Sequence, residues 1–284
     1  NILNQLPCYL LKKGDIYTPI MDLSDLNSIN SLCAEVKKRR FNIDVLILNA
    51  GLQYTGSKTP RRSIQGVELT FAVNHLSHFY LIQNLLPLIK SRNISKIIIT
   101  SSEVHNPMSS GGRVGARAGL GNLSGLASGV GFEMIDGNQF NADKAYKDSK
   151  LCNILFAKEL SNRLNKKSLK IPVIAWAPGL VISRDTKGFF RYSREYNQLG
   201  QILFSYLARD LLRITTSNEK AGILLSDLVC SCKYNKPGFN YYSNKLISLG
   251  EFIFEKTNIS DEAQREGLSK KLWNLSESLI DSKS

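Results

Sequence analysis

Short apolar runs alternate along this chain with longer segments in which apolar residues return every three or four positions. The short runs have the length and residue types of strands, and the longer segments have the period of amphipathic helices. Runs of the strand type fall at 16–21, 45–49, 96–100, 172–176 and 239–242. Segments of the helix type fall at 24–40, 66–90, 142–164, 219–229 and 261–279.

This alternation predicts an α/β fold of the Rossmann type, a doubly wound parallel sheet with helices on both faces. The run 45–49 is almost purely apolar, which is typical of a parallel strand buried between two helical layers. A chain of 284 residues can bury one such core. We therefore interpret residues 1–284 as a single domain.

The alternation disappears between residues 103 and 141, which we call the inserted segment. Glycine recurs there at 111, 112, 115, 119, 121, 125, 129, 131 and 137. So long a stretch without periodicity is uncommon inside an α/β domain unless it is functional. We predict that the inserted segment is a substrate loop or lid at the carboxyl end of a strand.

Composition narrows the classes of protein that fit. The formal net charge is +13, but the one dense basic run, 37–40, ends a predicted helix, where cations suit the helix dipole. No basic and aromatic motif of an RNA-binding domain is present, so we expect no nucleic-acid partner. The five cysteines show no CxxC spacing, which predicts neither a disulfide framework nor a metal site. No apolar stretch approaches the ~20 residues that cross a bilayer, which favours a soluble, non-secreted protein.

The strongest chemical signal is Tyr146 followed four residues later by Lys150 on a predicted helix. At this spacing the two side chains share one helix face. A lysine ammonium beside a phenol stabilises the phenolate, so we expect a lowered pKa for Tyr146 and proton donation near neutral pH. The spacing alone is common on solvated helices, so the surrounding residues decide whether it indicates a catalytic pair.

Polar residues and glycines at the ends of predicted strands supply that context. Ser102 follows one strand, and its hydroxyl could bind a substrate or orient Tyr146. Asn49-Ala50-Gly51 follows another strand, and Gly51 would let the backbone approach a cofactor closely. Pro178-Gly179 makes a sharp turn after a third strand, suited to receiving the carboxamide of a nicotinamide ring.

Asn74 is a polar amide inside the otherwise apolar segment 66–90. A buried amide needs hydrogen-bond partners. We expect Asn74 to hold the backbone of its helix and a water molecule near Lys150.

Taken in order along the chain, these elements resemble the short-chain dehydrogenase/reductase family, and the resemblance covers essentially the whole chain. It implies an oxidoreductase with a nicotinamide cofactor. The catalytic residues that it implies are Asn74, Ser102, Tyr146 and Lys150. The cofactor-binding residues that it implies are Asp22 on the adenine side, Asn49, Ala50, Gly51, Tyr146, Lys150, Pro178 and Gly179.

A narrower resemblance, to the light-dependent protochlorophyllide reductases, rests on stretches outside these positions. The matching stretches are NHLSHF at 74–79, GNLSGL at 121–126, MIDGNQF at 134–140, KAYKDSKLCN at 144–153, GFNYYSN at 238–244 and WNLSE at 273–277. The resemblance implies NADPH-dependent, light-driven reduction of protochlorophyllide to chlorophyllide, with Tyr146 and Lys150 delivering the proton. It also implies a hydrophobic pigment partner and a place in chlorophyll biosynthesis, in a cyanobacterial cytosol or a plastid stroma.

Two features depart from the family pattern. Family members begin with a strand, a TGxxxGxG turn and a helix that faces the cofactor phosphates, whereas this chain contains no TGxxxGxG. We therefore expect a fragment of a longer gene product, without the first strands, that alone binds NADPH poorly. The second departure is Leu180, which stands where protochlorophyllide reductases carry a cysteine. An isobutyl group cannot donate a proton.

Two other functions stay open. A dark NADP(H)-dependent short-chain reductase of a hydrophobic carbonyl substrate, such as a retinoid or steroid, fits the four catalytic positions equally well and the inserted segment less well. A catalytically impaired pigment-binding fragment fits the missing phosphate turn. The sequence also leaves two kinds of partner open. The segments 66–90 and 142–164 could pair subunits in a homo-oligomer, and the basic surface could bind peripherally to a thylakoid membrane.

Overall fold

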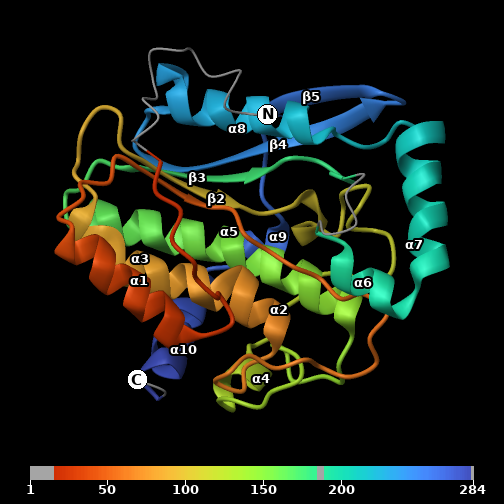
Figure 1. The fold of residues 1–284 in the computed structure, drawn as a ribbon, viewed down its shortest axis with the longest axis horizontal. Helices are drawn as coiled ribbons and strands as arrows, with labels where there is room; N and C mark the ends of the chain where they lie inside the picture. Colours follow the sequence, from red (N-terminus) through yellow and green to blue (C-terminus); the bar gives the residue numbers. More distant parts are fainter. Residues whose placement is uncertain (1–15, 184–188, 283–284) are drawn as a thin grey trace.

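A five-stranded sheet in the order β1-β2-β3-β4-β5 forms the centre of the structure (Figure 1). The computed structural model describes residues 16–183 and 189–282. The first four strands are parallel, and β5 returns antiparallel to β4. The strands are β1 (Val45–Leu48), β2 (Lys96–Thr100), β3 (Pro172–Ala177), β4 (Gly238–Ser248) and β5 (Glu251–Lys256).

Helices cover both faces of this sheet, which confirms the predicted Rossmann-type α/β class (Figure 1). The helices of the amino-terminal half are α1 (Leu26–Lys38), α2 (Leu69–Phe71), α3 (Ser77–Leu85), α4 (Ser124–Ala127) and α5 (Ala142–Lys166). Those of the other half are α6 (Arg191–Tyr196), α7 (Gln198–Ser205), α8 (Asn218–Cys230), α9 (Asp261–Gln264) and α10 (Leu268–Asp281).

The apolar strand β2 shows how the two layers share the core. Its side chains alternate, so that Ile97 and Ile99 pack in the main core with α3, α5 and α10, while Ile98 packs against Leu228 of α8. Every residue of β2 is buried. An uninterrupted apolar run is therefore the pattern that a strand between two helical layers requires.

The strand predicted at 16–21 is wrong, because these residues form no strand. Ile16 is half-exposed and Ile20 is fully exposed. β1 is the edge of the sheet within the described residues, so the segment pairs with no strand there. An extended segment without a partner cannot close the hydrogen-bond ladder that defines a strand.

The helix predicted at 66–90 forms with an irregular middle. Glu68 begins it, because its carboxylate accepts hydrogen bonds from the backbone of Thr70 and Phe71. A π-helical turn, Ala72–Leu76, then separates α2 from α3. Such turns widen a helix locally and are frequent at functional sites. This one contains Asn74.

The inserted segment has little regular structure, as predicted, but it is not detached from the domain. Outside α4 and the short turn Glu103–His105 it contains no helix or strand. Its apolar side chains nevertheless lie in the main core, and they include Leu120, Leu123, Leu126, Phe132 and Ile135. The segment is therefore a packed part of the domain, and its use as a substrate loop or lid stays a prediction.

The carboxyl-terminal third contains elements that the sequence pattern did not predict. The short strand expected at 239–242 is the longer β4, which forms a hairpin with β5. The helix expected at 261–279 is divided into α9 and α10, and Gly267, with φ of 74°, precedes α10. The helices α6 and α7 were also not predicted.

Candidate functional site

The helix α5 carries Tyr146 and Lys150 one turn apart. Asn141 begins the helix, because its side chain accepts a hydrogen bond from the backbone N–H of Lys144 at 2.9 Å. Lys150 Nζ lies 5.6 Å from the centre of the Tyr146 ring. Lys150 is buried and Tyr146 is half-buried. The two side chains therefore share one helix face, as their spacing indicates.

The pKa of Tyr146 is raised, not lowered as the sequence led us to expect. Burial raises this pKa, and a hydrogen bond with Ser102 acts in the opposite direction. The expected lowering by Lys150 is absent. The Lys150 ammonium donates to Thr100 O at 3.3 Å and lies 5.6 Å from the centre of the Tyr146 ring. Tyr146 is thus a neutral phenol at neutral pH, with a proton to give. Burial also lowers the pKa of Lys150 to about 8.

The residues after β2 bring Ser102 to Tyr146. Ser101 Oγ donates to the carbonyl of Lys150 at 2.9 Å, which joins the end of β2 to α5. Ser102 follows, and its hydroxyl also accepts from Val104 N at 3.5 Å at the start of a short helical turn. The contact predicted between Ser102 and Tyr146 is present.

Asn74 is fully buried, and both the oxygen and the nitrogen of its side-chain amide form hydrogen bonds. Asn74 Oδ1 accepts from Leu52 N at 2.8 Å, and Nδ2 donates to Leu52 O at 2.9 Å and to Ser149 Oγ at 2.9 Å. The expectation that Asn74 binds the backbone of its own helix is therefore wrong, because its backbone partner is Leu52. The backbone of Leu52 lies outside any strand, so its N–H and C=O need this amide. Asn74 thereby fixes the chain that leaves β1.

Gly51 lies in the space between Asn74 and Lys150. A Cβ at Gly51 would lie 3.3 Å from Asn74 Oδ1 and 3.4 Å from Lys150 Nζ. The residues before it reach the same edge of the sheet. Asn49 Oδ1 accepts from Thr100 Oγ1 at 2.8 Å, and Ala50 is exposed. The carboxyl ends of β1 and β2 thus meet beside Lys150, as parallel strands require.

The turn Pro178-Gly179 is held by two residues that the sequence pattern did not single out. Gly179 has φ of 87°, and a Cβ there would lie 2.7 Å from Thr216 Oγ1. Asn244 Nδ2 donates to Pro178 O at 3.1 Å and to Thr216 Oγ1 at 2.9 Å. Asn244 ends the stretch 238–244 that carries the narrower resemblance, but the sequence assigned neither it nor Thr216 to this turn.

Phe189 is a further neighbour that the sequence pattern missed. Its ring centre lies 5.3 Å from that of Tyr146 and 5.2 Å from that of Phe190. The pair supplies an apolar wall beside the phenol. The only signal in the sequence was two adjacent aromatic residues in a polar stretch.

Asp22 stands apart from this group. Its carboxylate accepts hydrogen bonds from Ser24 N at 2.8 Å and Ser24 Oγ at 2.7 Å, just before α1. Within the described part of the chain it makes no hydrogen bond to another predicted site residue. The adenine-side role of Asp22 therefore stays a prediction.

Charged residues on both sides of Tyr146 hold the inserted segment against α5. Lys144 forms ion pairs with Asp136 at 2.9 Å and Asp148 at 2.5 Å. Asp148 Oδ1 accepts from Gly119 N at 2.8 Å, and Lys147 Nζ donates to Ala116 O at 2.8 Å. Burial raises the pKa of Asp148 to about 7, although Lys144 opposes the shift. These contacts position the inserted segment relative to Tyr146.

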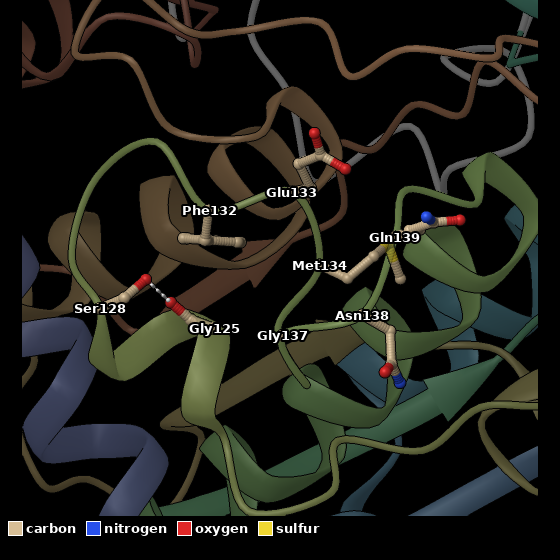
Figure 2. Close-up of a pocket in the computed structure, with 8 residues that line it drawn as sticks. All are labelled: Gly125, Ser128, Phe132, Glu133, Met134, Gly137, Asn138 and Gln139. Atoms are coloured by element: carbon tan, nitrogen blue, oxygen red, sulfur yellow. Dashed lines mark hydrogen bonds between the residues drawn. The ribbon is translucent and has the colours of Figure 1, made fainter.

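Residues of the inserted segment also line an open hollow of about 240 Å³, which Figure 2 shows. Ser128 Oγ donates to Gly125 O at 2.6 Å across its rim. The residues that line it are Gly125, Ser128, Phe132, Glu133, Met134, Gly137, Asn138 and Gln139. None of them is a predicted site residue, so the hollow is separate from the group around Tyr146.

The residues around Lys150 fit the nicotinamide side of a dinucleotide cofactor. The buried ammonium of Lys150 has three N–H donors. Among the described residues it makes one hydrogen bond, to Thr100 O. The remaining donors suit ribose hydroxyls, and Gly51 leaves room beside them. No group of histidine, cysteine, aspartate or glutamate in the described residues could hold a metal ion.

A family model and several relatives of known name match this chain. The short chain dehydrogenase family model matches residues 7–113. Protochlorophyllide reductase B of Oryza sativa subsp. japonica is 32% identical over 95% of this chain and 66% of that protein. The corresponding Hordeum vulgare protein is 32% identical over 95% and 67%, and protochlorophyllide reductase of Cucumis sativus is 34% identical over 92% and 64%.

Solved structures share the fold. An uncharacterized protein from Mycobacterium paratuberculosis superposes with a TM-score of 0.60 at 24% identity, over 92% of this chain and 74% of that one. L-sorbose reductase from Gluconobacter frateurii, complexed with NADPH and L-sorbose, gives 0.51 at 16% identity, over 79% and 73%. At these identities the likeness concerns the fold alone.

The chain spans about two thirds of the length of the curated relatives that it matches, 66% and 67% for the two cereal proteins. The similarity nevertheless runs through every element that carries a predicted site residue, because it covers 95% of this chain. On this similarity and on the fold, the chain belongs to the short-chain dehydrogenase/reductase family.

Proposed function

We propose that this chain acts as an NADPH-dependent oxidoreductase that reduces protochlorophyllide to chlorophyllide in the light, in a plastid stroma or a cyanobacterial cytosol. The observation that carries the proposal is the meeting of Tyr146, Lys150, Ser102 and Asn74 beside the carboxyl ends of β1 and β2. The relatives named protochlorophyllide reductase, at 32–34% identity, support the choice of substrate.

NADPH supplies a hydride when bound, and the residues that would hold it are Lys150, Gly51, Asn49, Ala50 and the turn Pro178-Gly179. The photon is absorbed by the pigment, whose chemistry the protein positions and shields from water.

Tyr146 would complete the reduction by giving a proton. Its raised pKa keeps the phenol protonated until the pigment becomes basic enough to accept the proton. The Ser102 hydrogen bond then favours the phenolate that remains. One ring double bond thereby gains a hydride at one carbon and a proton at the other.

The test is a light-dependent assay of this protein with protochlorophyllide and with NADPH at a concentration high enough to saturate the weak NADPH binding that we expect of this chain. We expect absorbance of chlorophyllide to appear only after illumination. Tyr146→Phe should lower turnover by about a hundredfold or more, the usual contribution of a positioned proton donor. Tyr80→Phe is the matched control, because Tyr80 is a partly exposed tyrosine of α3 outside the site, and it should keep full turnover.

A second candidate is a dark reductase of a hydrophobic carbonyl compound, which Leu180 favours. This residue follows the Pro178-Gly179 turn, and its isobutyl group cannot donate a proton. Equal product in darkness, or turnover of a hydrophobic ketone instead of protochlorophyllide, would support this candidate against the light-driven reaction. Pigment binding without turnover under either condition would instead support a catalytically impaired pigment-binding protein.

A further inference from the structure

His105 lies three residues after Ser102, in the short helical turn Glu103–His105 that follows β2. The side chain is buried, with the residue only 1% exposed. Its ring meets the ring of Tyr241 of β4 edge to face, with the ring centres 5.1 Å apart and the planes at 85°. A polar ring in such a place needs hydrogen-bond partners for its nitrogens.

Both ring nitrogens of His105 have a backbone partner. His105 Nε2 accepts a hydrogen bond from Ser260 N at 3.3 Å, so this nitrogen carries no proton in the neutral ring. The proton is therefore on Nδ1, which donates to Ser102 O at 2.7 Å. Burial lowers the pKa of His105 to about 4, so the ring is neutral at neutral pH. The fold thus fixes both the charge and the tautomer of His105.

The hydrogen bond from Nδ1 acts on the backbone of Ser102. The Ser102 carbonyl accepts twice from the same residue, from His105 N at 3.2 Å and from Nδ1 at 2.7 Å. Any residue except proline could supply the first bond, whereas the second requires a side-chain donor at position 105. The preceding residue is also fixed, because Ser101 Oγ donates to Lys150 O. Ser102 is therefore held on both sides while its hydroxyl reaches Tyr146.

The second partner of the ring belongs to a different part of the molecule. Ser260 begins α9, and its hydroxyl accepts from Ala263 N at 3.3 Å. The bond from Ser260 N to Nε2 therefore joins the turn after β2 to the start of α9. One ring thus makes two bonds with different consequences: the Ser260 bond joins two segments, and the Ser102 bond acts on a predicted catalytic residue.

We propose that His105 is a positioning residue for the reduction, whose Nδ1–H holds the Ser102 carbonyl so that the Ser102 hydroxyl stays within reach of Tyr146. Among the described residues its ring forms hydrogen bonds only with Ser102 and Ser260, so it acts on the phenol through Ser102. The inference rests on the proposed function, because it assumes that Ser102 and Tyr146 act in catalysis. It adds a residue that the four predicted catalytic positions do not include.

Two conservative variants separate the two hydrogen bonds of the ring. Asparagine places an amide nitrogen near the position of Nδ1 and no polar atom near that of Nε2, so His105→Asn keeps the Ser102 bond. Glutamine places an amide oxygen near the position of Nε2, so His105→Gln keeps the Ser260 bond instead. Each variant loses one hydrogen bond to the backbone, so the two should lose similar stability in urea unfolding.

Turnover should nevertheless differ between the variants. With saturating NADPH and pigment in the light, kcat should fall by about tenfold or more in His105→Gln and by less than about threefold in His105→Asn, because only the glutamine variant releases Ser102. KM should change little in either variant. If His105 were merely structural, kcat would fall equally in both variants, in step with their stability, and this result would overturn the inference.

A second measurement does not require turnover. The NMR signal of a carbon-13 label at tyrosine Cζ reports the hydrogen bond of the Tyr146 hydroxyl. Tyr146→Phe identifies the signal, and Ser102→Ala gives its position without the bond. His105→Gln should move the signal toward the Ser102→Ala position, and His105→Asn should leave it in place.

This measurement separates the inference from the proposed reaction. If the unaltered protein shows no turnover while the Tyr146 signal moves only in His105→Gln, the proposed reaction fails and the positioning role of His105 stands. A Tyr146 signal that stays in place in His105→Gln, or that moves equally in both variants, would contradict the positioning role whether or not the protein turns over pigment.

Discussion

At the scale of single residues, the site depends on Lys150, an ammonium that the fold has removed from water. Burial lowers its pKa to about 8, so an increasing fraction is neutral as the pH rises through that value. A neutral amine donates weaker hydrogen bonds to a cofactor. The charge of Lys150 is therefore the property most sensitive to pH near neutrality.

We expect kcat/KM of the reduction to fall on the alkaline side with a midpoint near pH 8, by about tenfold for each further pH unit. Lys150→Arg keeps a positive charge at every accessible pH, so its activity, although lower, should lose this alkaline decline. A pH series on both proteins is the measurement. An unchanged decline in the arginine variant would assign the titration to another group.

The sequence predicted part of this residue-scale picture. The spacing of Tyr146 and Lys150 and the position of Ser102 after a strand are local patterns, and the structure places them together. The direction of the Tyr146 pKa was not predictable, because it depends on how much protein surrounds the phenol. The contacts that Thr216, Asn244 and Phe189 make at the site were not predictable either, since they form only through the fold.

At the scale of elements, α5 both carries the phenol and holds the inserted segment. Lys147 is buried, forms an ion pair with Asp143 at 3.1 Å and donates to the carbonyls of Val114 and Ala116. These carbonyls belong to a stretch without helix or strand, so they depend on the lysine for part of their hydrogen bonding.

Lys147→Met should therefore lower the free energy of unfolding by about 2 kcal/mol, the usual cost of losing hydrogen bonds to a buried charged group. It should also speed proteolysis within the inserted segment, because the segment opens more often. Urea unfolding and timed digestion measure the two effects. Lys166→Met, at an exposed position near the end of the same helix, is the control and should change neither.

The helices and strands differed in how accurately the sequence pattern predicted them. The boundaries of β2 and α5 were predicted well because both have a strong apolar pattern and lie deep in the core. The segment 16–21 has a strand-like composition but no strand beside it within the described residues. The helix α7 was missed for a different reason. Its apolar residues face outward, so they do not follow the pattern of a helix that packs on the core within the described structure.

At the scale of the whole molecule, all three histidines are buried, and two of them, His75 and His105, hold distant segments together. His75 Nε2 lies 3.0 Å from Ser276 Oγ of α10, and His105 Nε2 accepts from Ser260 N at 3.3 Å. Burial lowers the pKa of His75 and His78 to about 3 and that of His105 to about 4. The folded chain therefore keeps all three neutral well below their ordinary pKa of 6.5.

Because these pKa values are lowered by folding, the histidines favour the folded state above about pH 6.5, and this contribution is lost as the pH falls toward 4. Between about pH 6 and pH 4 the unfolded chain binds up to three more protons, which corresponds to a loss of at most about 4 kcal/mol per pH unit from these residues together. Urea unfolding across this range is the measurement. His105→Gln should remove about a third of the slope, and an unchanged slope would contradict this account.

The contacts between α5 and the inserted segment also bear on how reductases of this family could be recombined. A substrate loop is usually treated as a part that can be exchanged between enzymes while the catalytic helix stays. Here Lys144, Lys147 and Asp148 alternate with Tyr146 and Lys150 on one helix, and each of the three contacts the inserted segment or holds a neighbour that does. A graft of residues 103–141 into another enzyme would therefore also have to transfer these three side chains. With the predicted role of the inserted segment as a substrate loop, substrate choice and proton delivery would then be inherited as one unit.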